Sequence, residues 1–199
     1  AAALTAALGG LKGPIMKVAQ LMATIPDLLP PDYAEELQKL QAEAPPMGAA
    51  FVKRRMMAEL GPDWQKRFAQ FDLHPAAAAS LGQVHRATTH DGKQVACKLQ
   101  YPDMQSAVEA DLSQLEMVFA IHRRMNPVLD TREAAKEIGA RVREELDYGR
   151  EAKHARLYAH MLRDEPMVQV PGVHADLSTR RLLTLAWLTG EELLAFKGH

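Results

Sequence analysis

A chain of 199 residues can bury a sizeable core, and its 47% apolar and 25% charged residues are ordinary for a globular protein. Lys and Arg number 24 against 25 Asp and Glu, so the net charge gives no reason to expect nucleic acid as a partner. The single cysteine, Cys97, excludes an internal disulfide and fits a reducing compartment, which makes cytoplasmic the default localisation. No apolar run approaches the roughly 20 residues that span a bilayer.

The N-terminal third of the chain is predicted to be helical. Apolar residues from Leu4 to Met22 recur at helical spacing, although Pro14 should kink that helix. Further helices are predicted over 33–42, with Asp32 as N-cap, and over 49–60. The first residues lack the basic flank of a signal peptide and are typical of a chain that begins inside a helix. We therefore expect a part of a longer protein.

The rest of the chain changes from strands to helices and back. Residues 68–101 have strand-like composition with turn signals, and helices are predicted over 104–125 and 131–162. Short strands are predicted over 167–170 and 181–187. Together these elements predict an α+β fold, with an antiparallel sheet of about five strands and one unusually long helix.

Residues 76–98 carry the most informative pattern. An alanine run leads into Ser80-Leu81-Gly82-Gln83-Val84, and Val95-Ala96-Cys97-Lys98 follows an Asp91-Gly92 turn. Strand, tight loop, strand, turn and strand with one emerging lysine is typical of kinase-like folds that cover nucleotide phosphates. Alanine stands where ordinary kinases have glycine, which restricts the backbone. Taken alone, an exposed strand lysine and a closely packed alanine segment are the commoner explanations.

Acidic residues gather late in the long predicted helix. Glu144, Asp147 and Glu151 would share one helical face, and Glu145 would lie about 100° away. They could pair with Lys98 or hold a metal-bound phosphate, although a solvated helix with arginine partners is the commoner arrangement.

A second weak signal lies near the N-terminus. Lys17 and Gln20 are three residues apart and would share a helical face. An ordinary surface pair on an amphipathic helix is by far the commoner explanation when they are considered alone.

These signals occur in an order that resembles the UbiB family, the atypical protein-kinase-like proteins with aarF domains. The matching segments are Lys17 to Gln20, Leu29-Pro30 with Pro45-Pro46, Ala77 to His85, Val95 to Pro102, Glu145-Leu146-Asp147, and Arg150-Glu151-Ala152. The resemblance spans nearly the whole chain. It implies a helical N-terminal extension over 1–67 and a kinase-like small lobe over 68–199.

The resemblance also implies roles for individual residues. Lys98 would bind the nucleotide phosphates, with Glu151 as its helix partner, and residues 186–190 would be the hinge toward the adenine. The loop over the nucleotide would be formed by Ala77, Ala78, Ala79 and Ser80. Glu145 and Asp147 would face the phosphates and the extension, whose Lys17 and Gln20 would lie across the pocket.

Three residues depart from the family pattern. Ala19 replaces a glycine, Cys97 replaces a small aliphatic residue, and His154 stands where asparagine is frequent. The chain also stops at His199, before a catalytic-loop aspartate or a D-F-G-like metal ligand. We therefore expect no metal site in this chain, Mg²⁺ ligands in an absent large lobe, and no turnover by this chain alone.

Two functions from different classes remain open. The first is the ATP-binding part of an atypical kinase or ATPase that supports ubiquinone biosynthesis. It implies ATP and Mg²⁺ as cofactors, a lipid-like quinone precursor as a possible partner, and a place peripheral to the inner membrane. The alternative is a non-catalytic, pseudokinase-like binding or scaffold module. An unrelated helical α+β domain is the third and least favoured interpretation.

Overall fold

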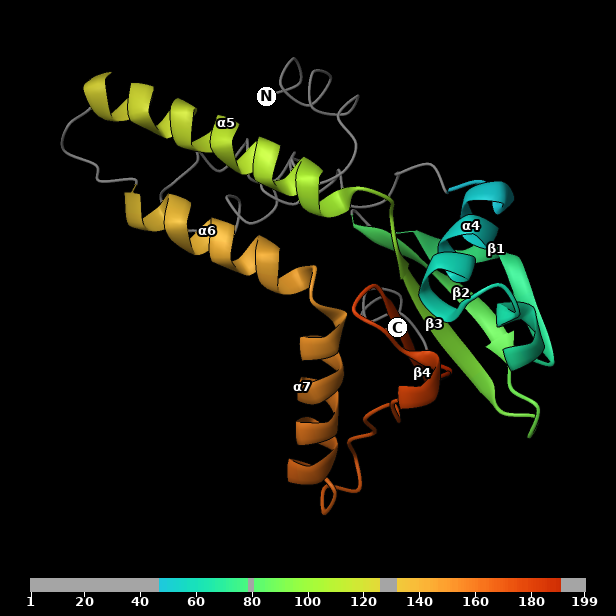
Figure 1. Cartoon of the computed structure of the whole chain (residues 1–199). Coiled ribbons are helices and arrows are strands. Elements are labelled where there is room, and N and C mark those ends of the chain that lie inside the picture. The colour runs from blue at the N-terminus through green and yellow to red at the C-terminus, as the bar shows by residue number, and fades with distance from the viewer. Residues whose placement is uncertain (1–46, 79–80, 126–131, 191–199) are drawn as a thin grey trace, which may run out of the picture.

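The computed structural model describes residues 47–78, 81–125 and 132–190. Within these ranges one antiparallel sheet is joined by helices, of which some pack on it and others extend away from it (Figure 1). The helices are α4 (Ala49–Leu60), α5 (Met104–Met125), α6 (Arg132–Glu145) and α7 (Tyr148–Met161), with 3-10 turns η2 (Trp64–Arg67) and η3 (Ala175–Leu177). The strands are β1 (Gln70–Ala78), β2 (Gly82–Thr88), β3 (Gln94–Gln100) and β4 (Leu182–Ala186).

The sheet has the order β1-β2-β3-β4, and each neighbouring pair is antiparallel. The turn between β2 and β3 is tight because Gly92 adopts a φ of 80°, a left-handed conformation that glycine accepts at little cost. The α+β prediction is confirmed. The expected strand count was too high, because the described residues form a four-stranded sheet.

Residues 167–170 were wrongly predicted as a strand. The only sheet-like contact near them, within the described residues, is an isolated bridge between Val173 and Leu185. Pro166 and Pro171 flank the segment, and proline cannot donate to a strand ladder. The apolar residues there therefore gave a misleading strand signal.

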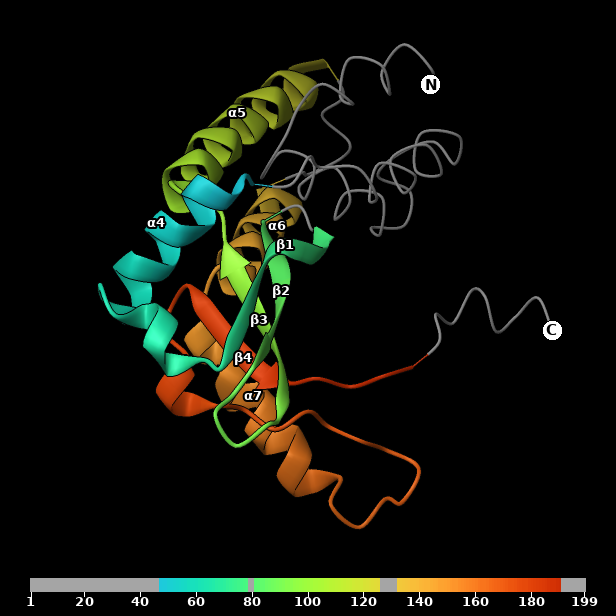
Figure 2. The same ribbon diagram turned by 90° about the vertical axis from the view of Figure 1, so that its right-hand side faces the viewer.

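One face of the sheet packs on the main core. Val95, Cys97 and Leu99 alternate along β3 and are fully buried against Val52 and Met56 of α4. Each such side chain contributes about 1.5–3 kcal/mol of burial free energy. In Figure 2, α4 lies along this side of the sheet.

The opposite face of β3 carries Ala96, Lys98 and Gln100. Tyr148 and Ala152, from the start of α7, pack on this face with Leu183 of β4. Helix α7 is therefore attached to the sheet by its first turns, and its later turns extend away from it (Figure 1).

Helices α5 and α6 form an antiparallel pair that extends away from the sheet (Figure 1). Their contact is a separate apolar cluster of Val108, Leu112, Ile138 and Val142. No helix within the described residues is long and apolar enough to cross a membrane.

The long helix predicted over 131–162 is broken into α6 and α7. The Asp147 carboxylate accepts a hydrogen bond of 3.0 Å from the Arg150 backbone N–H and caps α7. The Gln100 amide donates to the Leu146 carbonyl oxygen, and the Tyr148 N–H donates to the Arg180 carbonyl oxygen. Because the helix stops here, the prediction that Glu144, Asp147 and Glu151 share one continuous helical face was wrong.

Candidate functional site

Lys98 and Glu151 form an ion pair between the sheet and α7. The Lys98 Nζ lies 2.9 Å from Glu151 Oε1 and 2.7 Å from Oε2. The two side chains are 35% and 41% exposed, so the pair is anchored on the protein and open to solvent on one side. Their sequence separation of 53 residues shows that the fold, and not local structure, brings them together.

Tyr148 lies beside this pair and was not recognised from the sequence. Its ring centroid is 4.7 Å from the Lys98 Nζ, within the range of a cation–π contact. The side chain is almost completely buried, and burial raises the pKa of its hydroxyl well above the ordinary value. The available signal was its position directly after the E-x-D segment, where the Asp147 cap fixes the first turn of α7.

The alanine segment is only partly a loop in the described residues. Ala77 and Ala78 belong to β1, where they pair with Val84 and Gln83 of β2. Ala79 and Ser80 lie outside the described residues. The structure thus places Ala77 and Ala78 beside β2, the strand that pairs with the Lys98 strand β3.

Gly82 follows this segment and is enclosed on all sides. A Cβ atom there would lie 2.5 Å from the Leu99 carbonyl oxygen and 3.0 Å from the Tyr148 hydroxyl. Only glycine permits this close approach of β2 to β3 and α7. Gly82 therefore fixes the distance between the alanine segment and the Lys98 strand.

Val84 and Ala96 form a small apolar surface on the Lys98 side of the sheet. Val84 pairs directly with Lys98, and Ala96 stands two residues before it on the same strand. Both side chains are half-buried. They were not predicted as site residues, although the two-residue period of β3 places Ala96 on the same face as Lys98.

The remaining acidic residues near Lys98 have contacts or positions of their own. The Asp147 carboxylate caps α7, and Glu145 is the exposed last residue of α6. Glu144 pairs with Arg141 and Arg150, which is the arginine-partnered arrangement left open from the sequence. Within the described residues no group of three His, Cys, Asp or Glu side chains could hold a metal ion.

Some of the other predicted positions fall outside the described residues, and the rest lie on α7 and after β4. Lys17, Gln20 and Ala19 fall outside the described residues. His154 is exposed on α7. The segment after β4 begins with Trp187. Its backbone N–H donates to the Gln94 carbonyl oxygen, and its ring centroid lies 4.1 Å from the Arg86 guanidinium carbon.

Comparison with known proteins gives a consistent result. The ABC1 atypical kinase-like domain matches residues 39–198. The chain is 32% identical over 182 residues to AarF domain-containing protein kinase 1 of Mus musculus, covering 92% of this chain and 35% of that protein. It is 30% identical over 185 residues to Atypical kinase COQ8, mitochondrial, of Saccharomyces cerevisiae, covering 92% and 37%.

Two further relatives extend the comparison. The chain is 34% identical over 180 residues to Protein ACTIVITY OF BC1 COMPLEX KINASE 7, chloroplastic, of Arabidopsis thaliana, covering 89% of this chain and 26% of that protein. A solved complex of Rv3197 with erythromycin, from Mycobacterium tuberculosis, has a TM-score of 0.69 and 36% identity, covering 100% of this chain and 50% of that chain.

The lengths of these matches show how much of each relative this chain covers. It spans about a third of the length of the first two curated relatives and half of the solved structure. The fold, the order of motifs and the domain match agree with one another. The chain belongs to the ABC1 atypical kinase-like family, also called UbiB.

Proposed function

We propose that this chain is the ATP-binding part of an atypical kinase or ATPase. The observation that carries the proposal is the bidentate ion pair between Lys98 and Glu151. In kinase-like folds a strand lysine, held by a helix glutamate, contacts the nucleotide phosphates. Here the same two residue types meet in the same way, on β3 and α7.

The Lys98 ammonium can donate a hydrogen bond to a phosphate while it stays paired with Glu151. It carries three N–H donors, and two are directed at the Glu151 oxygens. The third donor remains for a phosphate oxygen on the exposed side. Glu151 thus fixes where the positive charge stands, and the position of α7 decides whether the pair is formed.

The side chains and the alanine segment next to Lys98 suit a bound nucleotide. Val84 and Ala96 offer a small apolar surface for the base on the same sheet face. The segment Ala77, Ala78, Ala79 and Ser80 would cover the phosphates, and Gly82 keeps β2 close to β3. Since no metal-ligand cluster occurs among the described residues, no step through Mg²⁺ is assigned to them.

For the whole protein we propose the properties that the UbiB resemblance implies. These are support of ubiquinone or another isoprenoid-quinone pathway, contact with a lipid-like precursor, and a place at a membrane surface. Lys17 and Gln20 would lie across the nucleotide pocket, with Glu145 and Asp147 toward the phosphates. The boundary near residue 67 between extension and lobe belongs to the same proposal.

The test compares two lysines with acidic partners. Lys98→Ala should weaken binding of a fluorescent ATP analogue to this chain about tenfold or more, since a charge-assisted contact to phosphate is lost. Lys93→Ala is the matched control, because Lys93 pairs with Asp91 in the β2–β3 turn at 69% exposure. Equal affinities of the two variants and the parent chain would reject the proposed role. Absence of saturable binding in all three would favour the scaffold alternative.

A further inference from the structure

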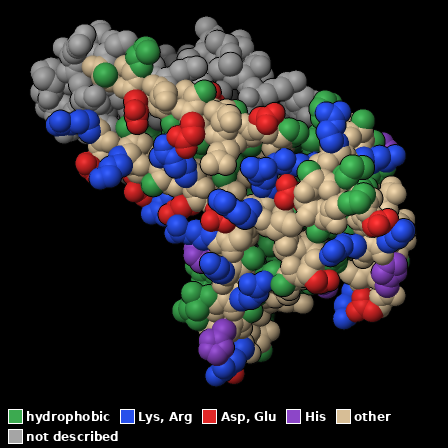
Figure 3. Space-filling model, viewed as in Figure 1, with side chains coloured by type: hydrophobic (Ala, Val, Ile, Leu, Met, Phe, Trp, Pro, Cys, Tyr) green, Lys and Arg blue, Asp and Glu red, His purple; other side chains and the backbone are tan. Residues whose placement is uncertain are grey.

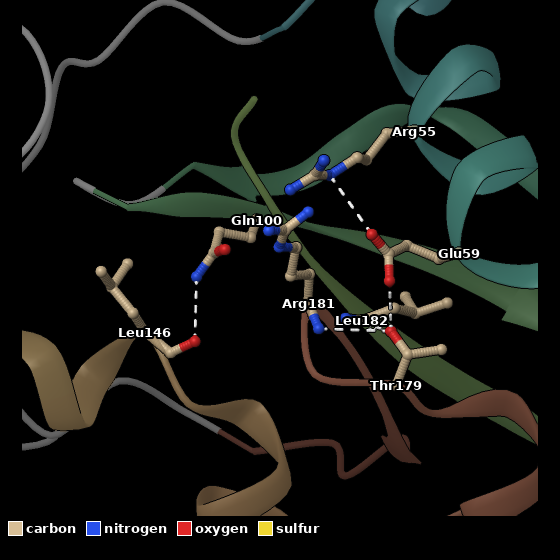
Figure 4. Close-up of polar contacts among 7 residues, drawn as sticks. All are labelled: Arg55, Glu59, Gln100, Leu146, Thr179, Arg181 and Leu182. Carbon is tan, nitrogen blue, oxygen red and sulfur yellow. Dashed lines mark hydrogen bonds and ion pairs between the residues drawn. The ribbon is translucent and has the colours of Figure 1, made fainter. Parts of the chain in front are cut away.

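A cavity lies apart from the Lys98–Glu151 pair. It has a volume of about 560 Å³ and is bordered by α4, the end of β3, the start of α5, the α6–α7 junction and the turn before β4. Arg143, Arg180 and Arg181 line it together with Gln100 and Thr179, whereas Lys98 and Glu151 do not. Figure 4 shows the centre of this region.

Arg55 is the most unusual group beside this cavity. Its side chain is only 12% exposed, and its Nε–H has no hydrogen-bond partner within the described structure. The nearest carboxylate oxygen, Glu59 Oε1, is 3.8 Å away. That is too long for a hydrogen bond, so Arg55 is a cation held behind the cavity wall with its Nε–H unpartnered.

A second arginine approaches Arg55. Figure 4 shows the guanidinium groups of Arg55 and Arg181 directed into the same space. Burial lowers the pKa of Arg55, Glu59 partly opposes this, and Arg181 lowers it further. Two like charges this close repel each other unless an anion joins them.

The acidic residues around the cavity already have partners. Glu109 makes a bidentate contact with Arg143 at 2.8 and 2.7 Å. Glu59 Oε2 accepts a hydrogen bond of 2.6 Å from the Thr179 hydroxyl, and Asp147 caps α7.

In contrast to these acids, the two arginines on the turn before β4 have no oppositely charged partner among the described residues. They are Arg180 and Arg181, and both side chains are exposed. In Figure 3, basic side chains lie among acidic ones across the middle of the face that is turned toward the viewer. Arg180 and Arg181 thus keep N–H donors that no carboxylate of the described residues occupies.

We propose that this cavity binds a phosphate group, carried either by a small soluble phosphate compound or by a phospholipid head group. The Arg181 guanidinium would donate to its oxygens, since arginine presents planar pairs of N–H donors that match phosphate, and the charge of the neighbouring Arg55 would add to the attraction. Arg180 would add charge at the mouth. Neither Lys98 nor Glu151 lines the cavity, so this proposal does not depend on the function proposed for Lys98.

The test uses inorganic phosphate on the chain with Lys98→Ala, so that the nucleotide site cannot account for binding. Calorimetry or ³¹P NMR should show saturable binding. Adding Arg181→Gln should weaken it about tenfold or more, because a charge-assisted pair is lost. Arg181 is exposed, so this change should not disturb folding, which circular dichroism checks.

The matched control is Arg156→Gln, which removes the same charge from an exposed position of α7 outside the cavity. It should leave phosphate affinity unchanged. A parallel arm uses vesicles of phosphatidylcholine with or without phosphatidic acid, and Arg181-dependent binding to the acidic vesicles alone identifies the lipid source. The proposal is overturned if neither probe binds saturably, or if Arg156→Gln weakens binding as much as Arg181→Gln.

Discussion

Tyr148 shows how one side chain connects the two halves of the candidate site. It is the first residue of α7, three residues before Glu151, and its ring borders the Lys98 ammonium at 4.7 Å. Its hydroxyl limits the space at Gly82. The lysine is therefore positioned by a carboxylate on one side and an aromatic ring on another.

We expect the aromatic ring of Tyr148 to matter more than its hydroxyl. Tyr148→Leu should weaken ATP binding roughly fivefold, because a partly exposed cation–π contact contributes about 1 kcal/mol. Tyr148→Phe keeps the ring and should restore most of the affinity. Both affinities should be measured well below the melting temperature of each variant, since the position is buried. An equal loss in the two variants would show that the ring does not position Lys98.

At the scale of elements, the α6–α7 junction controls where Glu151 stands. The capping contact from Asp147 begins α7, and the Gln100 amide holds the preceding residue to β3. Because α7 starts at a fixed point on the sheet, Glu151 reaches Lys98 one turn later. A change at the junction should therefore affect both stability and nucleotide binding.

Asp147→Ala removes this cap. The free energy of unfolding should fall by about 1 kcal/mol, the usual cost of losing an N-cap side chain. ATP affinity should fall as well if α7 shifts. Urea denaturation and nucleotide titration measure the two effects.

Asp63→Ala is the control for this prediction. Asp63 precedes η2 without a capping hydrogen bond from its side chain. Its ion pair with Lys66 is highly exposed and should contribute little. If the two variants lose the same stability, the cap at Asp147 has no special role.

The sequence predicted local elements well and long-range anchors poorly. The helix predicted over 49–60 matches α4, the helix predicted over 104–125 matches α5, and the Asp91-Gly92 turn joins β2 to β3. These follow from capping, periodicity and turn residues within the element itself. The break before α7 was missed because its anchors, Gln100 and Arg180, are far away in the sequence.

The same distinction applies to the sites. Lys98 could be singled out because a strand, a turn and an alanine segment stand next to it in sequence. The arginine-lined cavity could not, because Arg143 comes from α6, whereas Arg180 and Arg181 come from the turn before β4. No spacing rule relates such residues, so only the folded structure reveals them.

At the scale of the whole molecule, apolar side chains near the end of β4 are less exposed than those on the later turns of α7. The sequence predicts an exposed apolar face around Leu185, Trp187 and Leu188. Leu185 packs against the Tyr148 cluster, and the Arg86 guanidinium lies over the Trp187 ring, so Leu188, at 40% exposure, is the most exposed of the three side chains. A larger apolar group lies on the later turns of α7, at Leu157 and its neighbours.

This group of α7 residues should promote self-association of the chain. Leu157 is 54% exposed and Met161, one turn later, is 64% exposed. Changing both to Gln should keep the helix but remove apolar area, raising the dissociation constant about tenfold or more. Sedimentation velocity over a concentration series measures this. Met117→Gln, at a 65% exposed position of α5, should have no effect. If the double variant associates as strongly as the parent chain, another surface joins the copies.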